Sequence, residues 1–441
     1  MNNIKNININ FAQRRSIILE AIEKDSIILI SSSCPKVRNS DANYPFRQNS
    51  DFFYLTGFDE PESLMVLKST SSTREFILFC RDRDPLREQW DGFRAGQEGA
   101  IKDYGADISF SINTINEAMP DILLGVKNIY YPMSESNDIE QKVNKWLEIS
   151  RSAIRSGIEV PDTIISLDSI LHEMRLIKNF EELDIMKEAA KITAEAHCDA
   201  MRAVKPGMFE YQLEAEYLHT FMKRGSRSPA YNSIVGGGNN ACILHYNENK
   251  DQLKEGDLVL VDAGCEYQNY ASDVTRTFPV GGKFTEEQTA IYEIVLNAHS
   301  KALDEIKPGK PWICAHEASI KAITEGLLEL GILKGKLDKL IEEEAYSKFY
   351  MHRIGHWLGM DVHDVGNYKV DGNWRALEEG MVLTVEPGIY ILDSIKEVDP
   401  KWLGIGIRIE DDVVVTKNGN EILTSGVPRE IKHIEALMLS S

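Results

Sequence analysis

Short apolar runs alternate with stretches of helical periodicity through the first part of the chain. Apolar positions over Arg14–Glu23 recur at helical spacing, whereas Ser26–Ile30 is a compact apolar run of strand length. Ser63–Lys68 and Glu75–Cys80 are two further candidate strands bounded by turn residues, and Ile129–Pro132 is another. Strands that alternate with helices in this way predict an α/β domain.

A long helix-forming stretch, Leu167–Ala203, separates this pattern from the second half of the chain. It contains neither Gly nor Pro, its apolar residues recur at helical spacing, and Pro206-Gly207 follows it. A chain of 441 residues exceeds the usual span of one hydrophobic core. The predicted domains are therefore an N-terminal α/β domain, residues 1–170, and a second domain, residues 171–441.

The second half groups its strands with long helices instead of alternating them regularly. This arrangement predicts an α+β domain. The candidate strands are Leu258–Asp262, Asp273–Val280, Met381–Glu386 and Ile405–Val415. The candidate helices are Glu286–Ile306 and Ala315–Leu330.

Composition and charge narrow the class of protein. Hydrophobic residues make up 43% of the chain and charged residues 27%, which is typical of a globular protein. A net charge of -20 without a clustered basic patch argues against a nucleic-acid partner. The six cysteines form no C-x-x-C pair, and no early apolar run is long enough for a signal peptide or a membrane span. We expect a cytoplasmic protein with neither nucleic acid nor membrane as a partner.

Two aspartates flank a predicted hairpin. A turn near Tyr267 and Gln268 places Asp262 opposite Asp273, with Cβ atoms about 5 Å apart. Two carboxylates that close on buried strands require a cation or a shared proton. The alternative is that each aspartate only caps a strand end or a turn.

Three of the ten histidines fall within twelve residues, at His352, His356 and His363. Gly355 and Gly359 in the same segment indicate a backbone that other groups approach closely. A single histidine is more often structural, but three together favour a metal or catalytic site.

Two more acidic blocks end apolar strands. Glu386 precedes Pro-Gly at a strand end, and Arg408 and Glu410 share the face opposite the three isoleucines of Gly404–Glu410. The alternative for the second block is a half-solvated strand with an exposed ion pair. Taken together, the four blocks supply carboxylates and imidazole suited to two divalent cations about 3.5–4 Å apart. An oxygen-rich set with one nitrogen favours Mn²⁺ or a similarly hard ion.

With these residues assembled, nearly the whole chain resembles the aminopeptidase P family, within the metallopeptidases that include prolidase and methionine aminopeptidase. The most specific segment is His352–Asp364. Four segments carry the resemblance to the catalytic domain: Leu258–Gly264, His352–Asp364, Glu386–Gly388 and Ile407–Asp411. The resemblance to the accessory domain rests on Phe46–Gly57 with Glu60-Pro61.

The resemblance implies an α+β fold in which a smaller α/β domain, of the creatinase/aminopeptidase P N-terminal type, precedes a catalytic pita-bread domain. It also implies two divalent metal ions, with Mn²⁺ expected and Zn²⁺ or Co²⁺ as alternatives, and Glu386 as proton acceptor. By motif match the metal ligands are Asp262, Asp273, His356, Glu386 and Glu410, with Asp273 and Glu410 bridging, and the catalytic residues are His245, His352, His363, Glu386 and Arg408.

The implied activity is release of the N-terminal residue from peptides with proline in second position. The alternatives are a prolidase, which cleaves only Xaa-Pro dipeptides, and a non-catalytic peptide- or protein-binding module of the same fold. The segment Gln89–Gly92 resembles a loop that comes from a neighbouring subunit in family members, which implies a homodimer or homotetramer. One departure is Arg353, where the family often has Gly; this cation is expected to lower the pKa of His352 or to alter access.

Overall fold

The computed structural model of the protein describes residues 9–134 and 139–440. The described chain divides into two compact units, Ile9–Met174 and residues 175–440. Among the described residues, no helix combines the length and apolar character needed to cross a membrane.

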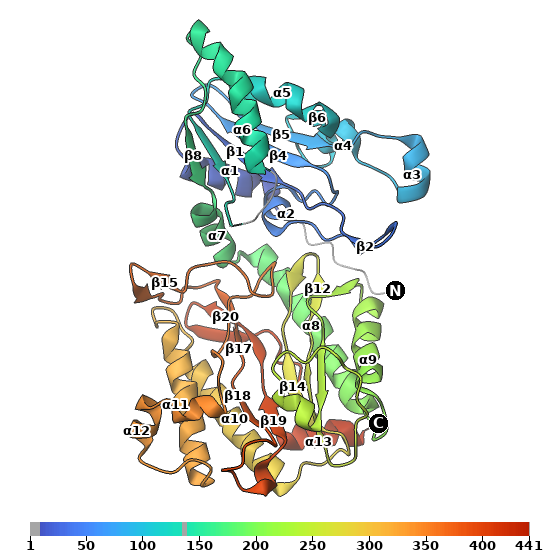
Figure 1. Cartoon of the computed structure of the whole chain (residues 1–441), viewed down its shortest axis with the longest axis vertical. Helices are drawn as coiled ribbons and strands as arrows, with labels where there is room; N and C mark the ends of the chain where they lie inside the picture. Colours follow the sequence, from blue (N-terminus) through green and yellow to red (C-terminus); the bar gives the residue numbers. More distant parts are fainter. Residues whose placement is uncertain (1–8, 135–138, 441) are drawn as a thin grey trace. The chain divides into compact units, whose positions relative to one another are not determined.

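The N-terminal unit is built on a mixed six-stranded sheet (Figure 1). The central strand β4 is antiparallel to both neighbours, and the outer pairs are parallel. In sheet order the strands are β6 (Ile108–Ser111), β5 (Arg74–Cys80), β4 (Leu64–Ser69), β1 (Ser26–Ser31), β7 (Asn128–Tyr131) and β8 (Thr163–Ser166). The remaining elements of the unit are α1 (Phe11–Ala21), α2 (Ser50–Thr56), α3 (Pro85–Asp91), α4 (Gly96–Lys102), α5 (Ile115–Ile122), α6 (Ile139–Ser150), α7 (Asp168–Leu176), β2 (Val37–Asn39) and β3 (Ala42–Asn43).

Both faces of this sheet are covered. Ile27 and Leu29 of β1 enter a core that also contains Met119 of α5 and Trp146 of α6. The alternate β1 residue, Ile28, points to the other face and is equally buried. Burial on both sides explains why β1 is a continuous apolar run and does not alternate with polar residues.

The stretch predicted as one helix, Leu167–Ala203, is two helices. After α7 the chain leaves the helical conformation and restarts as α8 (Phe180–Ala203). Asn179 accepts a hydrogen bond from the Glu182 backbone N–H, and the Glu182 carboxylate accepts one from the Asn179 N–H. This reciprocal capping box favours a helix start at Phe180 over continuation from α7.

The C-terminal unit contains several short antiparallel sheets with helices outside them. Figure 1 shows its strands between α8 and α9 on one side and α10 and α11 on the other. The strands are β9 (Ser228–Pro229), β10 (Ile234–Gly237), β11 (Leu258–Asp262), β12 (Cys265–Tyr267), β13 (Tyr270–Ala271), β14 (Thr275–Pro279), β15 (Lys369–Val370), β16 (Asn373–Trp374), β17 (Val382–Val385), β18 (Gly388–Ile391), β19 (Ile405–Arg408), β20 (Asp411–Thr416) and β21 (Gly419–Ile422). The helices after α8 are α9 (Glu210–Lys223), α10 (Glu286–Glu305), α11 (Ile313–Glu329), α12 (Leu337–Glu342) and α13 (Ile431–Leu439).

Two strand pairs form one interrupted hairpin. β17 pairs with β20 and β18 with β19, and one register runs through both pairs, with Val385 opposite Asp411 and Gly388 opposite Arg408. The strands break between these pairs, at Glu386 on one side and Glu410 on the other. The shared register places these two glutamates across from each other, where the ladder is open.

Candidate metal centre and active site

The hairpin that carries Asp262 has a different register from the one expected. Asp262 of β11 pairs with Thr275 of β14, so the prediction that it directly faces Asp273 is wrong. The turn is formed by Gln268 and Asn269, both in the left-handed region with φ of 48° and 65°, which shifts the pairing by two residues. Side chains alternate with a period of two, so a shift of two leaves both aspartates on the same face.

Tyr231 links the two aspartates. Its hydroxyl lies 2.5 Å from Asp262 Oδ1 and 2.6 Å from Asp273 Oδ1. One hydroxyl carries one proton, so it can donate to only one of these oxygens at a time. Burial and the two nearby carboxylates raise the pKa of Tyr231 well above its usual value. The second short contact therefore requires either a proton on one of the carboxyl groups, which the raised pKa of Asp262 favours, or a cation between the oxygens.

His356 faces the same group of carboxylates. Its Nε2 lies 3.4 Å from Asp273 Oδ2 and 3.6 Å from Glu386 Oε1. Its Nδ1 is 3.0 Å from the Trp357 carbonyl, which holds a proton on Nδ1 and leaves Nε2 directed at the acids. Donor atoms of Asp273, His356 and Glu410 all lie within 4.8 Å of one another, a spacing that can hold a metal ion.

Arg408 supports the centre from one side. Its guanidinium donates to Asp262 Oδ2 at 2.6 Å, to Thr275 Oγ1 at 3.0 Å and to the Tyr390 hydroxyl at 3.0 Å. Thr275 in turn donates to Glu410 Oε2 at 2.6 Å. Arg408 and Glu410 are both buried, which contradicts the alternative of a half-solvated strand with an exposed ion pair.

The pKa values of the four carboxyl groups reflect their burial and their closeness to one another. Burial raises the pKa of Asp262, raises that of Glu386 to about 7 and raises that of Glu410 well above its usual value. Burial also opposes ionisation of Asp273, but its hydrogen bond and attraction to His356 lower its pKa overall. Burial likewise disfavours charged His356, yet Asp273 and Glu386 raise its pKa to about 9.

These residues fit a pair of hard divalent cations. Four carboxylates converge with His356 on one cavity, and the charges of Arg408 and of protonated His356 together do not balance four ionised carboxylates. Carboxylate oxygen with a single nitrogen is the donor set that such ions prefer, and shared carboxylates suit two ions at close range.

His352 lies at the edge of the acid cluster. Its Nε2 is 2.9 Å from the Tyr390 hydroxyl, and its Nδ1 is 2.8 Å from the Arg353 carbonyl and 3.8 Å from Glu386 Oε2. Burial, and then the charge of Arg408, lower the pKa of His352 to about 3, whereas Arg353 contributes its carbonyl, which raises it. The charge that lowers this pKa most is therefore that of Arg408, and an effect of the Arg353 cation stays a prediction.

All nine predicted site residues line one cavity of about 1010 Å³ within the C-terminal unit. The His363 ring lies 4.3 Å from that of His356, centroid to centroid, and its pKa is lowered by burial and then by the charge of His356. The predicted residues that share the cavity are His245, Asp262, Asp273, His352, His356, His363, Glu386, Arg408 and Glu410.

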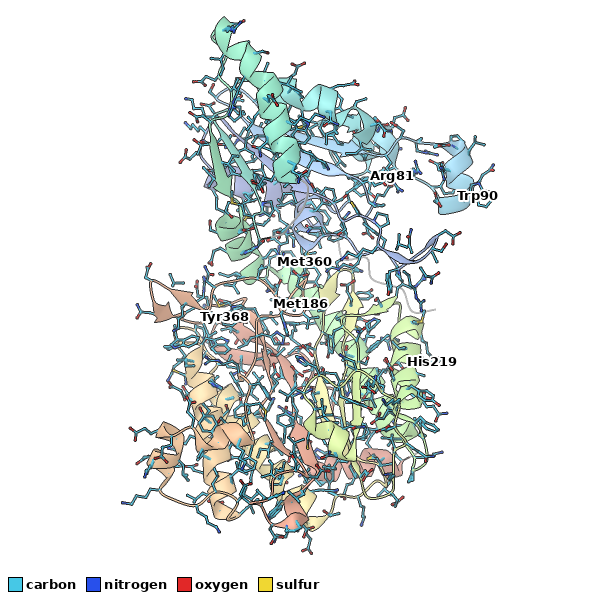
Figure 2. All side chains as sticks on the ribbon, in the orientation of Figure 1. Arg81, Trp90, Met186, His219, Met360 and Tyr368 are labelled. Atoms are coloured by element: carbon cyan, nitrogen blue, oxygen red, sulfur yellow. The ribbon has the colours of Figure 1, made fainter. Side chains whose placement is uncertain are left out.

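Several supporting residues were missed from the sequence. Thr384 Oγ1 donates to Glu386 at 3.2 Å, and Asp412 accepts the backbone N–H of Asp273 at 3.1 Å. An aromatic wall of the cavity was missed as well; Tyr368, labelled in Figure 2, belongs to it with Trp312 and Trp374. The three aromatic residues belong to no recognisable motif. Thr384 lies two residues before Glu386 on the predicted strand Met381–Glu386, and Asp412 lies next to the Ile407–Asp411 match, so these two positions carried a signal.

Comparison with known proteins agrees with this architecture. The family model described as metallopeptidase family M24 matches residues 184–417, and that described as aminopeptidase P, N-terminal domain, matches residues 11–130. The Xaa-Pro aminopeptidase of Escherichia coli (strain K12) is 46% identical over 432 residues, 98% of each chain. The predicted combination of an α/β N-terminal domain and a C-terminal metallopeptidase domain is confirmed.

Solved structures lead to the same assignment. The structure of Pseudomonas aeruginosa aminopeptidase PepP has a TM-score of 0.97 and 51% identity, covering 98% of this chain and 99% of that chain. Zinc-substituted E. coli aminopeptidase P in complex with product has a TM-score of 0.94 and 46% identity, covering 98% of each chain. The chain belongs to metallopeptidase family M24 and, by its N-terminal domain and its relatives, to the aminopeptidase P branch of that family.

Proposed function

We propose that this protein is a metal-dependent Xaa-Pro aminopeptidase, which releases the N-terminal residue from peptides whose second residue is proline. One observation carries the proposal: the four carboxylates and His356 converge with three further histidines on one cavity. The relative that is 46% identical over nearly the whole chain bears the same activity in its name.

The centre would hold two divalent cations, with Mn²⁺ as the expected ion and Zn²⁺ or Co²⁺ as alternatives. Asp273 and Glu410 would be the ligands shared by the ions, and the positions of Glu386 and Glu410 across from each other at the break in the β17–β20 hairpin fit this arrangement. The full ligand set is Asp262, Asp273, His356, Glu386 and Glu410. When bound, the two ions activate water and polarise the substrate carbonyl.

The protein's own residues then move protons and hold charge. Glu386 accepts the proton of the attacking water, since its carboxylate lines the cavity, 3.6 Å from His356 Nε2. His363 or His245 stabilises the oxyanion of the tetrahedral intermediate by hydrogen bonding. The departing proline nitrogen needs a proton, and His352, 3.8 Å from Glu386, lies where it can relay one.

The substrate explains why a dedicated site is needed. The Xaa-Pro bond is a tertiary amide, and proline has no backbone N–H for a general peptidase to bind. In this cavity Trp312, Tyr368 and Trp374 offer a rigid apolar surface. Such a surface suits the pyrrolidine ring of proline, because the ring carries a CH₂ group on the backbone nitrogen where other residues carry an N–H.

The protein is also proposed to be cytoplasmic and to form a homodimer or homotetramer. Helix α3 and the residues just after it expose large apolar side chains, with Trp90 86% and Phe93 90% exposed (Figure 2). Exposed aromatic residues next to each other are typical of a contact surface. Substitution of Trp90 by Ala is expected to shift the mass measured by light scattering toward the monomer, and an unchanged mass contradicts this part of the proposal.

The activity is tested on protein stripped of metal with a chelator. A tripeptide Xaa-Pro-Yaa and a dipeptide Xaa-Pro are compared with and without added Mn²⁺. Metal-dependent release of the first residue from the tripeptide is the expected result. Cleavage of the dipeptide alone identifies a prolidase, and no cleavage with any divalent metal leaves a binding module of the same fold.

A further inference from the structure

The cavity contains two arginines with different surroundings. Arg408 is buried and bound to Asp262, so its charge is committed to the metal centre. Arg353 is exposed and, within residues 9–134 and 139–440, forms no ion pair. The guanidinium of Arg353 is therefore a positive charge in the cavity wall that is available to bind a ligand.

Arg353 is held against the aromatic wall. Its guanidinium carbon lies 5.6 Å from the centroid of the Trp374 ring, and Trp374 stacks on Trp312 with centroids 5.6 Å apart and an interplanar angle of 23°. Lys369, paired with Trp374 across β15 and β16, places its Nζ 4.5 Å from the same ring. An aromatic face attracts a cation while leaving its N–H groups free to donate. Two cations on one ring make this wall attractive to an anion.

The position of Arg353 relative to the reacting bond sets what it can reach. It follows His352 directly, and the His352 ring is 3.8 Å from Glu386. The terminal carboxylate of a tripeptide lies about two extended residues beyond the scissile carbonyl, or roughly 7 Å. Arg353 lines the same cavity as the acid cluster, and a long side chain on the residue after His352 is suited to that distance.

We propose that Arg353 is a specificity-determining residue that binds a carboxylate on the substrate downstream of proline. This carboxylate is either the C-terminus of a tripeptide or an acidic side chain in a longer peptide. A guanidinium presents paired N–H donors that match the two oxygens of a carboxylate. The inference rests on the proposed aminopeptidase function and adds the substrate class that it prefers.

The test measures KM and kcat for three peptides: Ala-Pro-Leu, its C-terminal amide, and Ala-Pro-Glu amide, all with saturating Mn²⁺. Wild type, R353Q and R353K are compared. The control K301A removes an exposed cation on α10 that does not line the cavity. Because Arg353 is exposed, its replacement leaves the core intact, and the effect is expected in KM with kcat little changed.

Wild type is expected to show a KM about three- to tenfold lower for a peptide with the recognised carboxylate than for Ala-Pro-Leu amide. R353Q loses this preference, R353K keeps part of it and K301A keeps all of it. A preference for Ala-Pro-Leu identifies the C-terminal carboxylate, and one for Ala-Pro-Glu amide identifies the acidic side chain. The inference is overturned if wild type has no preference or if R353Q retains it. If wild type cleaves none of the peptides, the aminopeptidase proposal itself fails.

Discussion

Arg276 and Asp411 form an ion pair in which both side chains are 0% exposed, with Arg276 Nη2 2.7 Å from Asp411 Oδ1. The same guanidinium donates to the Glu410 carbonyl at 2.5 Å. Arg276 lies on β14 and Asp411 begins β20, so the pair ties together the two strand systems that carry Asp273 and Glu410. It fixes the backbone directly behind the metal centre.

Removal of one member of this pair is expected to destabilise the protein strongly. Asp411→Asn leaves the buried charge of Arg276 without a counter-charge, although its backbone carbonyl partners remain, which lowers the free energy of unfolding by about 3–5 kcal/mol. Denaturant titration measures the change. The control Glu343→Gln breaks the exposed ion pair between Glu343, the residue after α12, and Lys339 of α12. This variant is expected to lower the free energy of unfolding by only about 0.5 kcal/mol. Similar losses in the two variants would contradict the assignment.

The carboxylates of Asp273 and Glu410, the two proposed bridging ligands, are expected to be essential for turnover. Asp273→Ala or Glu410→Ala removes a carboxylate that the proposed centre would share between its two ions, and loss of several kcal/mol of charge stabilisation lowers kcat/KM by at least about 1000-fold. Metal content, determined by elemental analysis of the purified variant, should fall in parallel. Glu329→Ala at the end of α11 is the control. Near-normal activity in either site variant would rule out the two-metal centre.

Metal binding is expected to release protons in a pH-dependent way. In the metal-free chain the pKa of Glu386 is raised by burial to about 7, and Asp273 and Glu386 raise the pKa of His356, against its burial, to about 9. A ligand must lose its proton to bind metal, so Glu386 releases one at pH 6 but few at pH 8, while His356 releases one at both. Apparent affinity therefore rises with pH.

Calorimetric titration of Mn²⁺ in buffers of different ionisation enthalpy counts these protons. Release is expected to be larger at pH 6 than at pH 8, and Glu386→Gln should remove most of the difference. A proton count that is the same at both pH values would contradict the raised pKa of Glu386.

Gly264 is expected to tolerate no side chain. A Cβ at this position would lie 1.7 Å from the Ser272 backbone oxygen, across the hairpin that carries Asp262 and Asp273. Gly264→Ala must push the strands apart, which lowers the free energy of unfolding by about 2–3 kcal/mol and weakens metal binding. Gly419→Ala is the matched control, because no heavy atom lies within 4 Å of its added Cβ. Equal stability of the two variants by thermal melting would contradict this close approach.

The strands and the site residues could be predicted because they depend on local patterns. Apolar runs such as Leu258–Asp262 specify a buried strand by themselves, and a polar residue that ends such a run is placed at a strand end. Motif resemblance then assigned the roles of residues such as His356 and Glu410, and the cavity contains all of them.

Contacts between distant segments were decided only by the tertiary structure. The turn at Gln268 and Asn269, and not the positions of the acids, sets the hairpin register, so Asp262 faces Thr275. Tyr231 reaches Asp273 across 42 positions of the chain, and a single tyrosine in a loop has no periodicity that could announce this.

The sequence by itself determined which residues were expected at the candidate site, because their types and spacing follow from strand ends and motifs, and the structure brings all nine to one cavity. The tertiary structure decided how the charges are balanced: Arg408 is committed to Asp262, whereas Arg353 lies against Trp374 with its charge open to the cavity. Both are arginines at motif positions, and only the packing of the sheets around each guanidinium distinguishes a buried ion pair from an exposed one.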